Sequence, residues 1–261
     1  MSLRRSVMDA LAVSNDWEIS FEVYHSLEEQ QLLPEIASCL SIKALLAIHN
    51  LDDRYTVQMR SNAEQMAPKQ GDLPFLRHKN HVIGGSDIMN FLKEKEYVLN
   101  TEQTPEENVI NLGVLSLIQS KLIPAEMLVT WINSKNAIET SKRYGFEKPE
   151  PLKTILYFQK RQQVQRYLNE VGWLNKSEET VGREIQEMFA YFSKRLENNK
   201  YLTGESLTEA DVFLFGHLQA IIECPLEENI LSKVLAQFPR LQKFCLNFNQ
   251  LHLGQQAMLF S

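Results

Sequence analysis

The pattern of apolar residues changes near residue 100, and this change constrains the fold more than any other feature of the 261-residue sequence. Before it, short strand-like runs alternate with helical stripes, whereas after it helix start signals follow one another. We therefore predict an N-terminal extension at residues 1–18, a mixed α/β unit at 19–100 and an all-helical unit at 101–261. The connection between the last two lies near residues 100–104.

The first half of the mixed unit predicts a β-α-β order. Residues 31–33 suggest a short first strand that Pro34 closes. Apolar residues then recur every four positions from Ile36 to Ile48, which predicts an amphipathic helix. Alternation over residues 55–59 predicts the second strand.

The second half predicts a hairpin followed by a helix. Residues 75–78 and 81–83 form two short apolar runs, and Lys79-Asn80 between them has the length and composition of a tight turn. Ser86 follows two glycines and is predicted to cap the next helix. The complete order is that of a thioredoxin-like half-domain. Pro74 stands just before the third strand, where this fold carries a cis-proline, so we predict a cis Leu73–Pro74 bond.

Several start signals divide the helical unit. Thr104 supplies a capping hydroxyl ahead of Pro105, and Glu107 can return the hydrogen bond. Pro124 is predicted to start a second helix, and the prolines within residues 149–151 are predicted to mark the boundary of the next one. Ser177, followed by two glutamates, is predicted to start a further helix.

The segment around Leu207, Thr208 and Asp211 is the most specific signal in the chain. Thr208 and Asp211 have the spacing of a capping box, and Leu207 can pack on Val212. The helix that follows is too apolar to lie in water, so both polar side chains are needed to satisfy backbone amides. We interpret the motif as structural rather than catalytic.

These residues also carry a resemblance. The pattern Leu-Thr-x-Ala-Asp-x-x-Leu-Phe after a mixed half resembles the helical-domain signature of the glutathione transferase superfamily. The closer resemblance, from Tyr24 to the C-terminus, is to the metaxin family and especially its type-2 branch. It is carried jointly by the following segments: Arg60-Ser-Asn-Ala-Glu64 with Met66, Pro68 and Pro74-Phe75, Arg143-Tyr144-Gly145, Pro151-Leu152, Gln159-Lys160, Gly172-Trp173 and Phe215-Gly216-His217-Leu218.

The resemblance implies a glutathione transferase-like fold and a non-catalytic, peripheral subunit on the cytosolic face of the mitochondrial outer membrane. It implies a heterodimer with a membrane-anchored metaxin partner. It also implies contacts with the barrel subunit of the sorting and assembly machinery and with β-barrel precursor proteins during their import and assembly. Some metaxins resemble adaptors that link mitochondria to motor proteins, and this alternative stays open.

A glutathione-dependent transferase is the other alternative. Such an enzyme needs a Tyr, Ser or Cys just after the first strand, but Pro34 and Glu35 follow the predicted strand, and Glu35 would repel an anionic sulfur. Of the two residues that would hold the γ-glutamyl end, Gly85 and Ser86, only Ser86 is suited to do so. Leu73 and Pro74 are needed for the fold in any case. We expect these four positions to be vestigial, with no catalytic residue and no cofactor.

Other reactive side chains predict little chemistry. Cys39 lies near a helix start but beside an apolar stripe, so we interpret it as a buried structural thiol. His78 and His81 flank a turn without a third ligand nearby, which favours a solvated turn over a metal site. His217 lies among aromatic residues and is interpreted as a core histidine with a backbone partner.

The net charge of −6 argues against a nucleic-acid partner, which normally requires a basic excess. However, residues 142–166 hold seven basic residues and only two acidic ones. We interpret this run as an ordinary solvated helix face, and the alternative is docking to anionic lipid or to an acidic partner through Lys153, Lys160, Arg161 and Arg166. The longest apolar run, residues 212–222, is too short to span a bilayer, so membrane association is expected to be peripheral.

Overall fold

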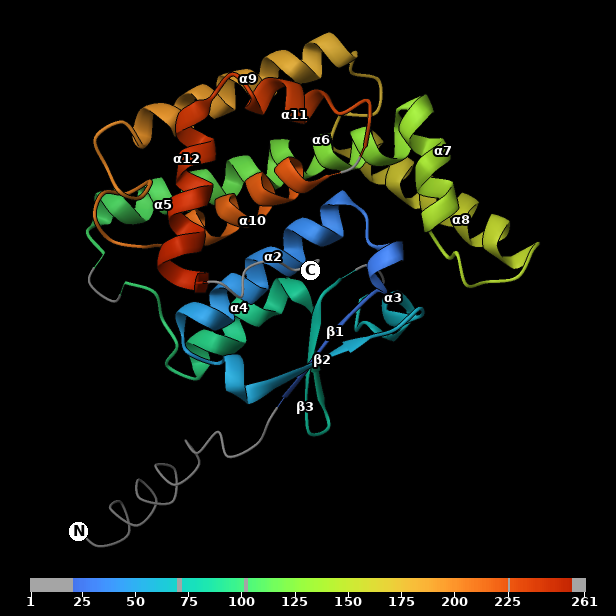
Figure 1. The fold of residues 1–261 in the computed structure, drawn as a ribbon, viewed down its shortest axis with the longest axis horizontal. Helices are drawn as coiled ribbons and strands as arrows, with labels where there is room; N and C mark the ends of the chain where they lie inside the picture. The colour runs from blue at the N-terminus through green and yellow to red at the C-terminus, as the bar shows by residue number, and fades with distance from the viewer. Residues whose placement is uncertain (1–20, 70–71, 101–102, 225, 255–261) are drawn as a thin grey trace, which may run out of the picture.

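The computed structural model describes residues 21–69, 72–100, 103–224 and 226–254, and the predicted extension at 1–18 lies outside them. Its four strands form one sheet in the order β2-β1-β3-β4 (Figure 1). The strands are β1 (Phe21–His25), β2 (Tyr55–Met59), β3 (Phe75–His78) and β4 (His81–Ile83). Strand β1 runs parallel to β2 and antiparallel to β3, and β3 and β4 form the predicted hairpin.

The predicted location of the first strand is wrong. Strand β1 lies ten residues earlier than expected, and Leu33 already belongs to helix α2 (Leu33–Ile48). The physical reason is that Pro34 stands in the first turn of this helix, where its missing N–H costs nothing, so it starts a helix instead of closing a strand. The position after the first strand is therefore Ser26.

Helices cover the two faces of the sheet unequally. Helix α2 and helix α4 (Gly85–Glu94) cover one face, where Phe21, Val23 and Leu76 join the main hydrophobic core (Figure 1). Within the described part of the chain, the other face carries only the single turn α3 (Ala63–Met66), packed over Tyr24 and Phe75. The cis Leu73–Pro74 bond is confirmed. Helix α4 begins one residue before Ser86 with Gly84 at its N-cap, so the predicted cap at Ser86 is wrong; the side chain of Ser86 is not described.

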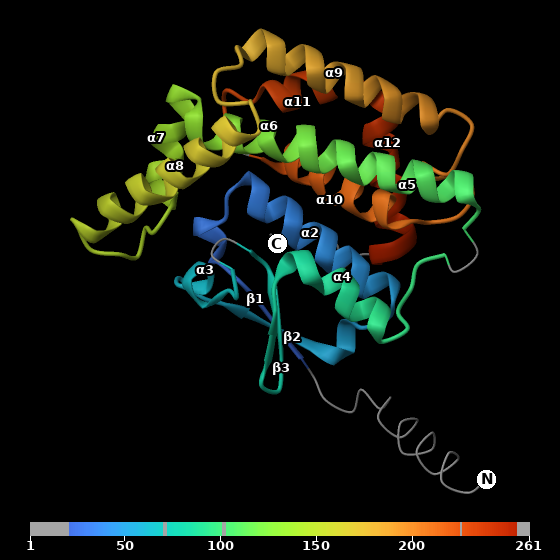
Figure 2. The same cartoon turned by 180° about the vertical axis from the view of Figure 1, so that it is seen from behind.

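The rest of the described chain is mainly helical. Its helices are α5 (Pro105–Leu117), α6 (Ile123–Met127), α7 (Ser134–Arg143), α8 (Leu152–Glu170), α9 (Glu178–Arg195), α10 (Glu209–Glu223), α11 (Ile230–Leu235) and α12 (Pro239–Phe248). Helices α5, α6 and α9 to α12 stack above α2, and α7 and α8 extend to one side (Figures 1 and 2). The predicted caps at Thr104 and Ser177 are confirmed. Thr208 and Asp211 form the predicted capping box.

Pro124 does not start a new helix as predicted. Helices α5 and α6 belong to one continuous helix, Pro105–Ile132, in which two π-helical turns at Ile118–Leu122 and Leu128–Ile132 interrupt the regular pattern. Such turns shift the backbone hydrogen bonds by one residue and let a proline be accommodated. Among the described residues this is the one helix long and apolar enough to cross a membrane, but its inner side, including Val114 and Leu122, packs in the core.

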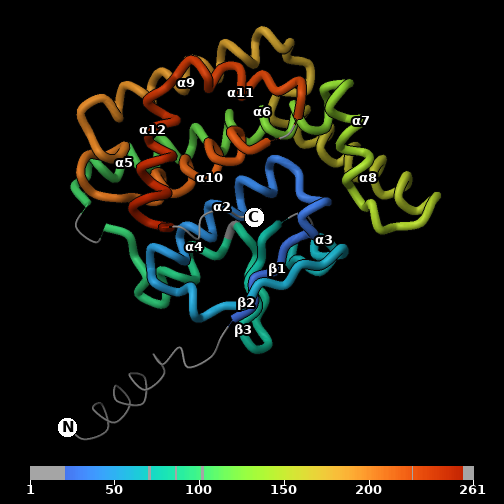
Figure 3. Tube along the Cα trace, viewed as in Figure 1, coloured from blue at the N-terminus to red at the C-terminus, as the bar shows by residue number. Residues whose placement is uncertain are grey.

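Helix α10 joins the two halves of the molecule. It lies directly on α2, and the last described helical turn, Asn249–Leu253, also returns to α2 (Figure 3). At the crossing, an ideal Cβ on Gly216 would lie 2.6 Å from the backbone nitrogen of Ser41 and 2.7 Å from the carbonyl oxygen of Ala37. Only glycine lets the two helices approach this closely.

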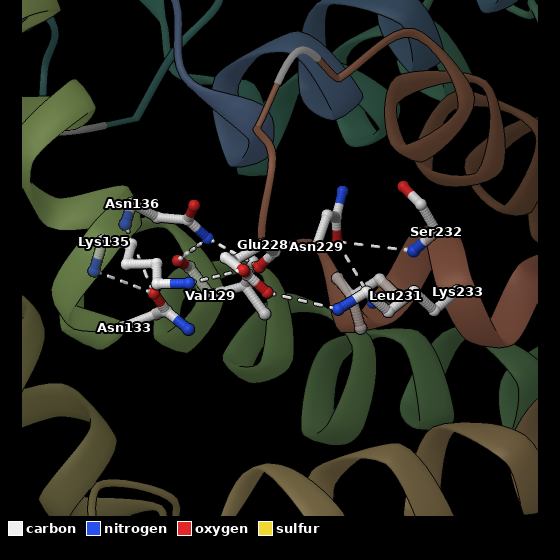
Figure 4. A network of polar contacts seen from close by, with 9 residues as sticks. All are labelled: Val129, Asn133, Lys135, Asn136, Glu228, Asn229, Leu231, Ser232 and Lys233. Atoms are coloured by element: carbon white, nitrogen blue, oxygen red, sulfur yellow. Dashed lines mark hydrogen bonds and ion pairs between the residues drawn. The ribbon is translucent and has the colours of Figure 1, made fainter.

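A polar network anchors α7 to the segment before α11 (Figure 4). Asn133 and Asn229 cap these two helices through their side-chain oxygens. The side-chain amide of Asn136 donates to the carbonyl oxygens of Val129 and Glu228, at 3.0 and 2.8 Å. The carboxylate of Glu228 also pairs with lysines of both helices, Lys135 at 2.7 Å and Lys233 at 3.2 Å. The start of α7 is thereby fixed to the C-terminal helices.

Candidate functional site

A cavity of about 190 Å³ lies between the two halves, at the start of α2. Its walls come from the loop after β1, from α3, from the segment before β3 and from helices α6 to α8. The residues that matter for its chemistry are Ser26, Glu35, Glu64, Leu73, Tyr144, Lys148 and Lys160. Leu73 is the residue before the cis-proline, the position at which a transferase would bind its ligand through the backbone. It lines this cavity.

Glu64 is the centre of a polar cluster that crosses the cavity. Lys160 of α8 forms an ion pair and hydrogen bond with its Oε1, and the hydroxyl of Tyr144 donates to its Oε2 at 2.7 Å. The side chains of Lys160 and Glu64 are only 20% and 10% exposed. Burial, together with the neighbouring Glu64 carboxylate, raises the pKa of Tyr144, so its hydroxyl stays a donor. Both halves of the molecule are thus tied together across the cavity.

Sequence reasoning did not identify this cluster. Tyr144 and Lys160 lie 80 and 96 positions from Glu64, so no local spacing connects them. All three nevertheless belong to segments that carry the metaxin resemblance, Arg60–Glu64, Arg143–Gly145 and Gln159–Lys160. The resemblance was therefore the one signal that could have grouped them.

Glu35 lies in the first turn of α2 and faces the same cavity. Its Oε1 accepts a hydrogen bond from the backbone nitrogen of Ser26 at 2.8 Å. Burial raises the pKa of Glu35 to about 7, against the opposing effect of that hydrogen bond. Ser26, and not Pro34, follows the first strand, so the expectation that no Tyr, Ser or Cys stands at this position is wrong. Ser26 also lines the cavity.

We expect Glu35→Gln to remove a pH dependence of stability. The folded carboxyl keeps its proton up to about pH 7, whereas an ordinary glutamate releases it near 4.5. Because the native state then binds more protons within this window, the free energy of unfolding of the wild type falls as pH rises through it. The neutral amide does not titrate. The melting temperature of Glu35→Gln minus that of the wild type at the same pH should therefore be larger at the alkaline end of this window than at its acidic end. Glu94→Gln, at an exposed site on α4, is the control, and parallel pH profiles for wild type and Glu35→Gln would contradict the assignment.

The four predicted vestigial positions come close together around the cis bond. An ideal Cβ on Gly85 would lie 3.0 Å from the carbonyl oxygen of Pro74, which brings the start of α4 against it. Leu73 lines the cavity between the halves, and Pro74 lines a second cavity of about 200 Å³ between α2 and β2. That Leu73, Pro74, Gly85 and Ser86 are remnants of a ligand site stays a prediction.

The thiols are buried or half-buried. Cys39 is buried, as expected, and burial raises the pKa of its thiol well above the ordinary value, with Glu35 adding to the effect. Burial also raises the pKa of Cys224 and Cys245. None of these environments favours a thiolate. His78 and His81 face each other across the hairpin, and within the described ranges no three His, Cys, Asp or Glu side chains are grouped as a metal site would need.

His217 is a core histidine, as predicted, but its partner is a carboxylate and not a backbone group. Its Nδ1 lies 2.7 Å from Oε1 of Glu126, which is fully buried. Burial raises the pKa of Glu126, and the histidine opposes that shift. Because Glu126 and His217 lie 91 positions apart, the pair could not be read from spacing.

The four predicted docking residues do not share one environment. Lys160 is not an exposed charge, because its ammonium is engaged by Glu64. The ammonium of Lys153 donates to the carbonyl oxygen of Lys142 at 3.0 Å, Arg161 is half-buried, and Arg166 is exposed. Docking through Lys153, Arg161 and Arg166 stays a prediction.

Two family models each match a part of the chain. The model of the family described as "Outer mitochondrial membrane transport complex protein" matches residues 39–161. The family model of the glutathione S-transferase C-terminal domain matches residues 185–248. Among solved structures, the β-etherase LigF from Sphingobium has a TM-score of 0.64 at 12% identity, covering 93% of this chain and all of that one. A glutathione transferase from Populus trichocarpa has a TM-score of 0.56 at 10% identity, over 91% and 97%. The glutathione transferase-like fold is therefore confirmed.

Similar sequences define the family more closely. Metaxin-2 of Mus musculus is 30% identical over 243 residues, which cover 92% of this chain and 91% of the relative. The metaxin-2 homologue of Caenorhabditis elegans is 31% identical over 221 residues, or 83% and 94%. Metaxin-1 of Mus musculus is 27% identical over a shorter alignment of 196 residues, or 72% and 62%. The chain belongs to the metaxin family, and within it to the type-2 branch.

Proposed function

We propose that the protein is a non-catalytic, peripheral subunit on the cytosolic face of the mitochondrial outer membrane, where it binds a membrane-anchored metaxin partner during import and assembly of β-barrel proteins. The observation that carries the proposal is the similarity to metaxin-2 over nine-tenths of both chains. The family description, an outer mitochondrial membrane transport complex, supports the location and the link to import. Contacts with the barrel subunit of the sorting and assembly machinery and with β-barrel precursors follow from the same proposal.

The polar groups that cross the cavity argue against catalysis there. Lys160 and Tyr144 satisfy both carboxylate oxygens of Glu64, so the polar groups that cross the cavity already have partners within the chain. Glu35 adds a second carboxyl group to the same wall. A thiolate placed there could not be stabilised by Lys160, because that ammonium already pairs with Glu64.

A glutathione-dependent activity is the second candidate, because Ser26 follows β1 and lines the same cavity as Leu73. Chromatography on immobilised glutathione distinguishes the two. The proposal expects the protein in the flow-through, with conjugation of a generic electrophile at the uncatalysed rate. The opposite outcome is retention on the column that free glutathione reverses, together with conjugation that Ser26→Ala abolishes. These two results would refute the proposal and show that the protein is a glutathione-dependent enzyme.

Two fractionation experiments on intact mitochondria test location and attachment. External protease should degrade the protein while matrix proteins stay intact, because the proposed site is the cytosolic face. Alkaline extraction should release it, while the anchored partner recovered with it in mild detergent stays in the membrane pellet. Protection from protease, or a lone species without any metaxin partner, would refute the proposal.

A further inference from the structure

Helix α8 carries large apolar side chains on two different sides. Those on its inner side are buried in the helical half: Tyr157, Val164 and Leu168. Its outer side has an apolar residue at every third position, and these three are 44%, 49% and 54% exposed: Leu152, Ile155 and Phe158. Positions three or four apart lie on one side of a helix, so these residues form a continuous stripe with further exposed positions. We call the stripe the α8 face, and its members are Leu152, Ile155, Phe158, Gln159, Gln162 and Arg166.

The α8 face belongs to a part of the molecule that projects outward. Figures 1 and 2 show α7 and α8 extending away from the other helices, with the turn between them, residues 144–151, outermost. This turn adds Phe146, which is 40% exposed, at the end of α8 where Leu152 lies. Leu156 and Val164 line the cavity between the halves from a different side of α8. The α8 face is therefore a convex apolar surface and not part of that cavity.

The charges along α8 all have one sign. Residues 151–169 include no acidic residue, and apart from Lys160 their basic residues are Lys153, Arg161 and Arg166. Arg166 is exposed on the α8 face, and Arg161 lies one helical turn from Phe158. Among the described residues, no carboxylate pairs with either arginine. Because the whole chain has a net charge of −6, an anionic surface would attract this projection and repel most of the remaining surface.

A lipid surface matches these features better than a protein does. The side chains that contribute most to protein interfaces fill pockets of the partner and are surrounded by polar contacts of both signs. The α8 face instead offers a row of projecting apolar side chains beside unpaired arginines. A helix that lies at a bilayer surface places its apolar residues at the boundary of headgroups and acyl chains, while its basic residues reach the lipid phosphates. Gln159 and Gln162 stay hydrated at that depth.

We propose that the α8 face binds directly to the surface of an anionic lipid bilayer, with α8 lying in the plane of the headgroups. Leu152, Ile155 and Phe158 enter the boundary between headgroups and acyl chains, and Arg161 and Arg166 bind lipid phosphates. The inference rests on the proposed function for its setting at a membrane, and it adds a direct contact with lipid to the contact with the anchored partner.

Flotation of the purified full chain with vesicles tests the contact. The wild type should float with vesicles of three parts phosphatidylcholine to one part phosphatidylserine and should not float with phosphatidylcholine alone. Added salt should release it, because salt screens the arginines. The double variant Ile155→Gln, Phe158→Gln keeps the charge and should weaken binding about tenfold or more, since it removes two apolar side chains from the boundary.

A matched control and a charge variant make the test specific. Ile222→Gln, Leu246→Gln changes two apolar residues of α10 and α12, 47% and 62% exposed, and should bind vesicles as the wild type does. Arg166→Gln should weaken binding to the anionic vesicles and make the remaining binding less sensitive to salt. All of these side chains are exposed, so the melting temperatures of the variants should match that of the wild type and exclude misfolding.

Two results would overturn the inference. One is a wild type that does not float with the anionic vesicles. The other is a double variant at Ile155 and Phe158 that floats as well as the wild type, and if this variant also fails to capture the anchored partner, the α8 face is a protein interface. Neither result affects the proposed function, because the vesicles contain no other protein. Protection from external protease in mitochondria refutes the proposed function and leaves vesicle binding unchanged.

Discussion

Gly216→Ala is expected to lower the free energy of unfolding by about 2 to 3 kcal/mol, and the melting temperature by roughly 5 to 10 °C. The added methyl group would meet two backbone atoms of α2, the nitrogen of Ser41 at 2.6 Å and the carbonyl oxygen of Ala37 at 2.7 Å. Backbone cannot rotate away as a side chain can, so α2 and α10 must separate. The loss should appear in chemical denaturation and in thermal melting.

Gly113→Ala is the matched control for this prediction. It makes the same change inside a helix, but its methyl group meets no atom within 4 Å. Alanine favours a helix interior by about 1 kcal/mol over glycine, so this control should be as stable as the wild type or more so. If Gly216→Ala also stabilised the protein, the close approach of the two helices would be refuted.

Asp211→Ala is expected to cost about 3 kcal/mol of unfolding free energy. The carboxylate accepts from the backbone nitrogens of Leu202 at 2.7 Å and Thr208 at 2.9 Å, and from the hydroxyl of Thr208 at 2.7 Å. Alanine would leave two buried N–H groups without an acceptor. Urea unfolding of wild type and variant measures the difference.

Two further variants make the Asp211 test specific. Asp211→Asn keeps one oxygen that can accept from Leu202 but turns an amide nitrogen toward Thr208, so its loss should be intermediate. Glu205→Ala removes an exposed carboxylate from the preceding loop and should change stability by less than about 0.5 kcal/mol. An Asp211→Ala variant as stable as this control would show that other groups cap α10.

Burial raises the pKa of Asp211 to about 6, against the opposing effect of its hydrogen bonds. Because an ordinary aspartate titrates near 3.8, the native state binds more protons between these two values, and the contribution of Asp211 to stability falls as pH rises through them. Asp211→Asn does not titrate there. Its loss of unfolding free energy relative to the wild type should therefore be smaller at the upper end of this window than at the lower end.

Local signals in the sequence predicted the elements whose start depends on neighbouring residues. The hairpin, the cis-proline and the caps at Thr104 and Ser177 each use residues within a few positions, and all are confirmed. The same kind of signal was wrong at Pro34 and Pro124. A proline fits both the first turn of a helix and a strand end, and a π-helical turn can accommodate it inside a helix.

The sequence by itself determined the fold class, the β3–β4 hairpin, the family resemblance and the burial of Cys39 and His217, because apolar periodicity and local capping are properties of short segments. Only the tertiary structure decided which distant polar groups meet: Glu64 with Tyr144 and Lys160, and Glu126 with His217. It also decided that Lys160 crosses a cavity instead of facing solvent, and that Gly216 serves a helix crossing. The physical reason is that a buried charge needs a partner wherever the fold can supply one, and the packing of whole helices, not the spacing of residues, selects that partner.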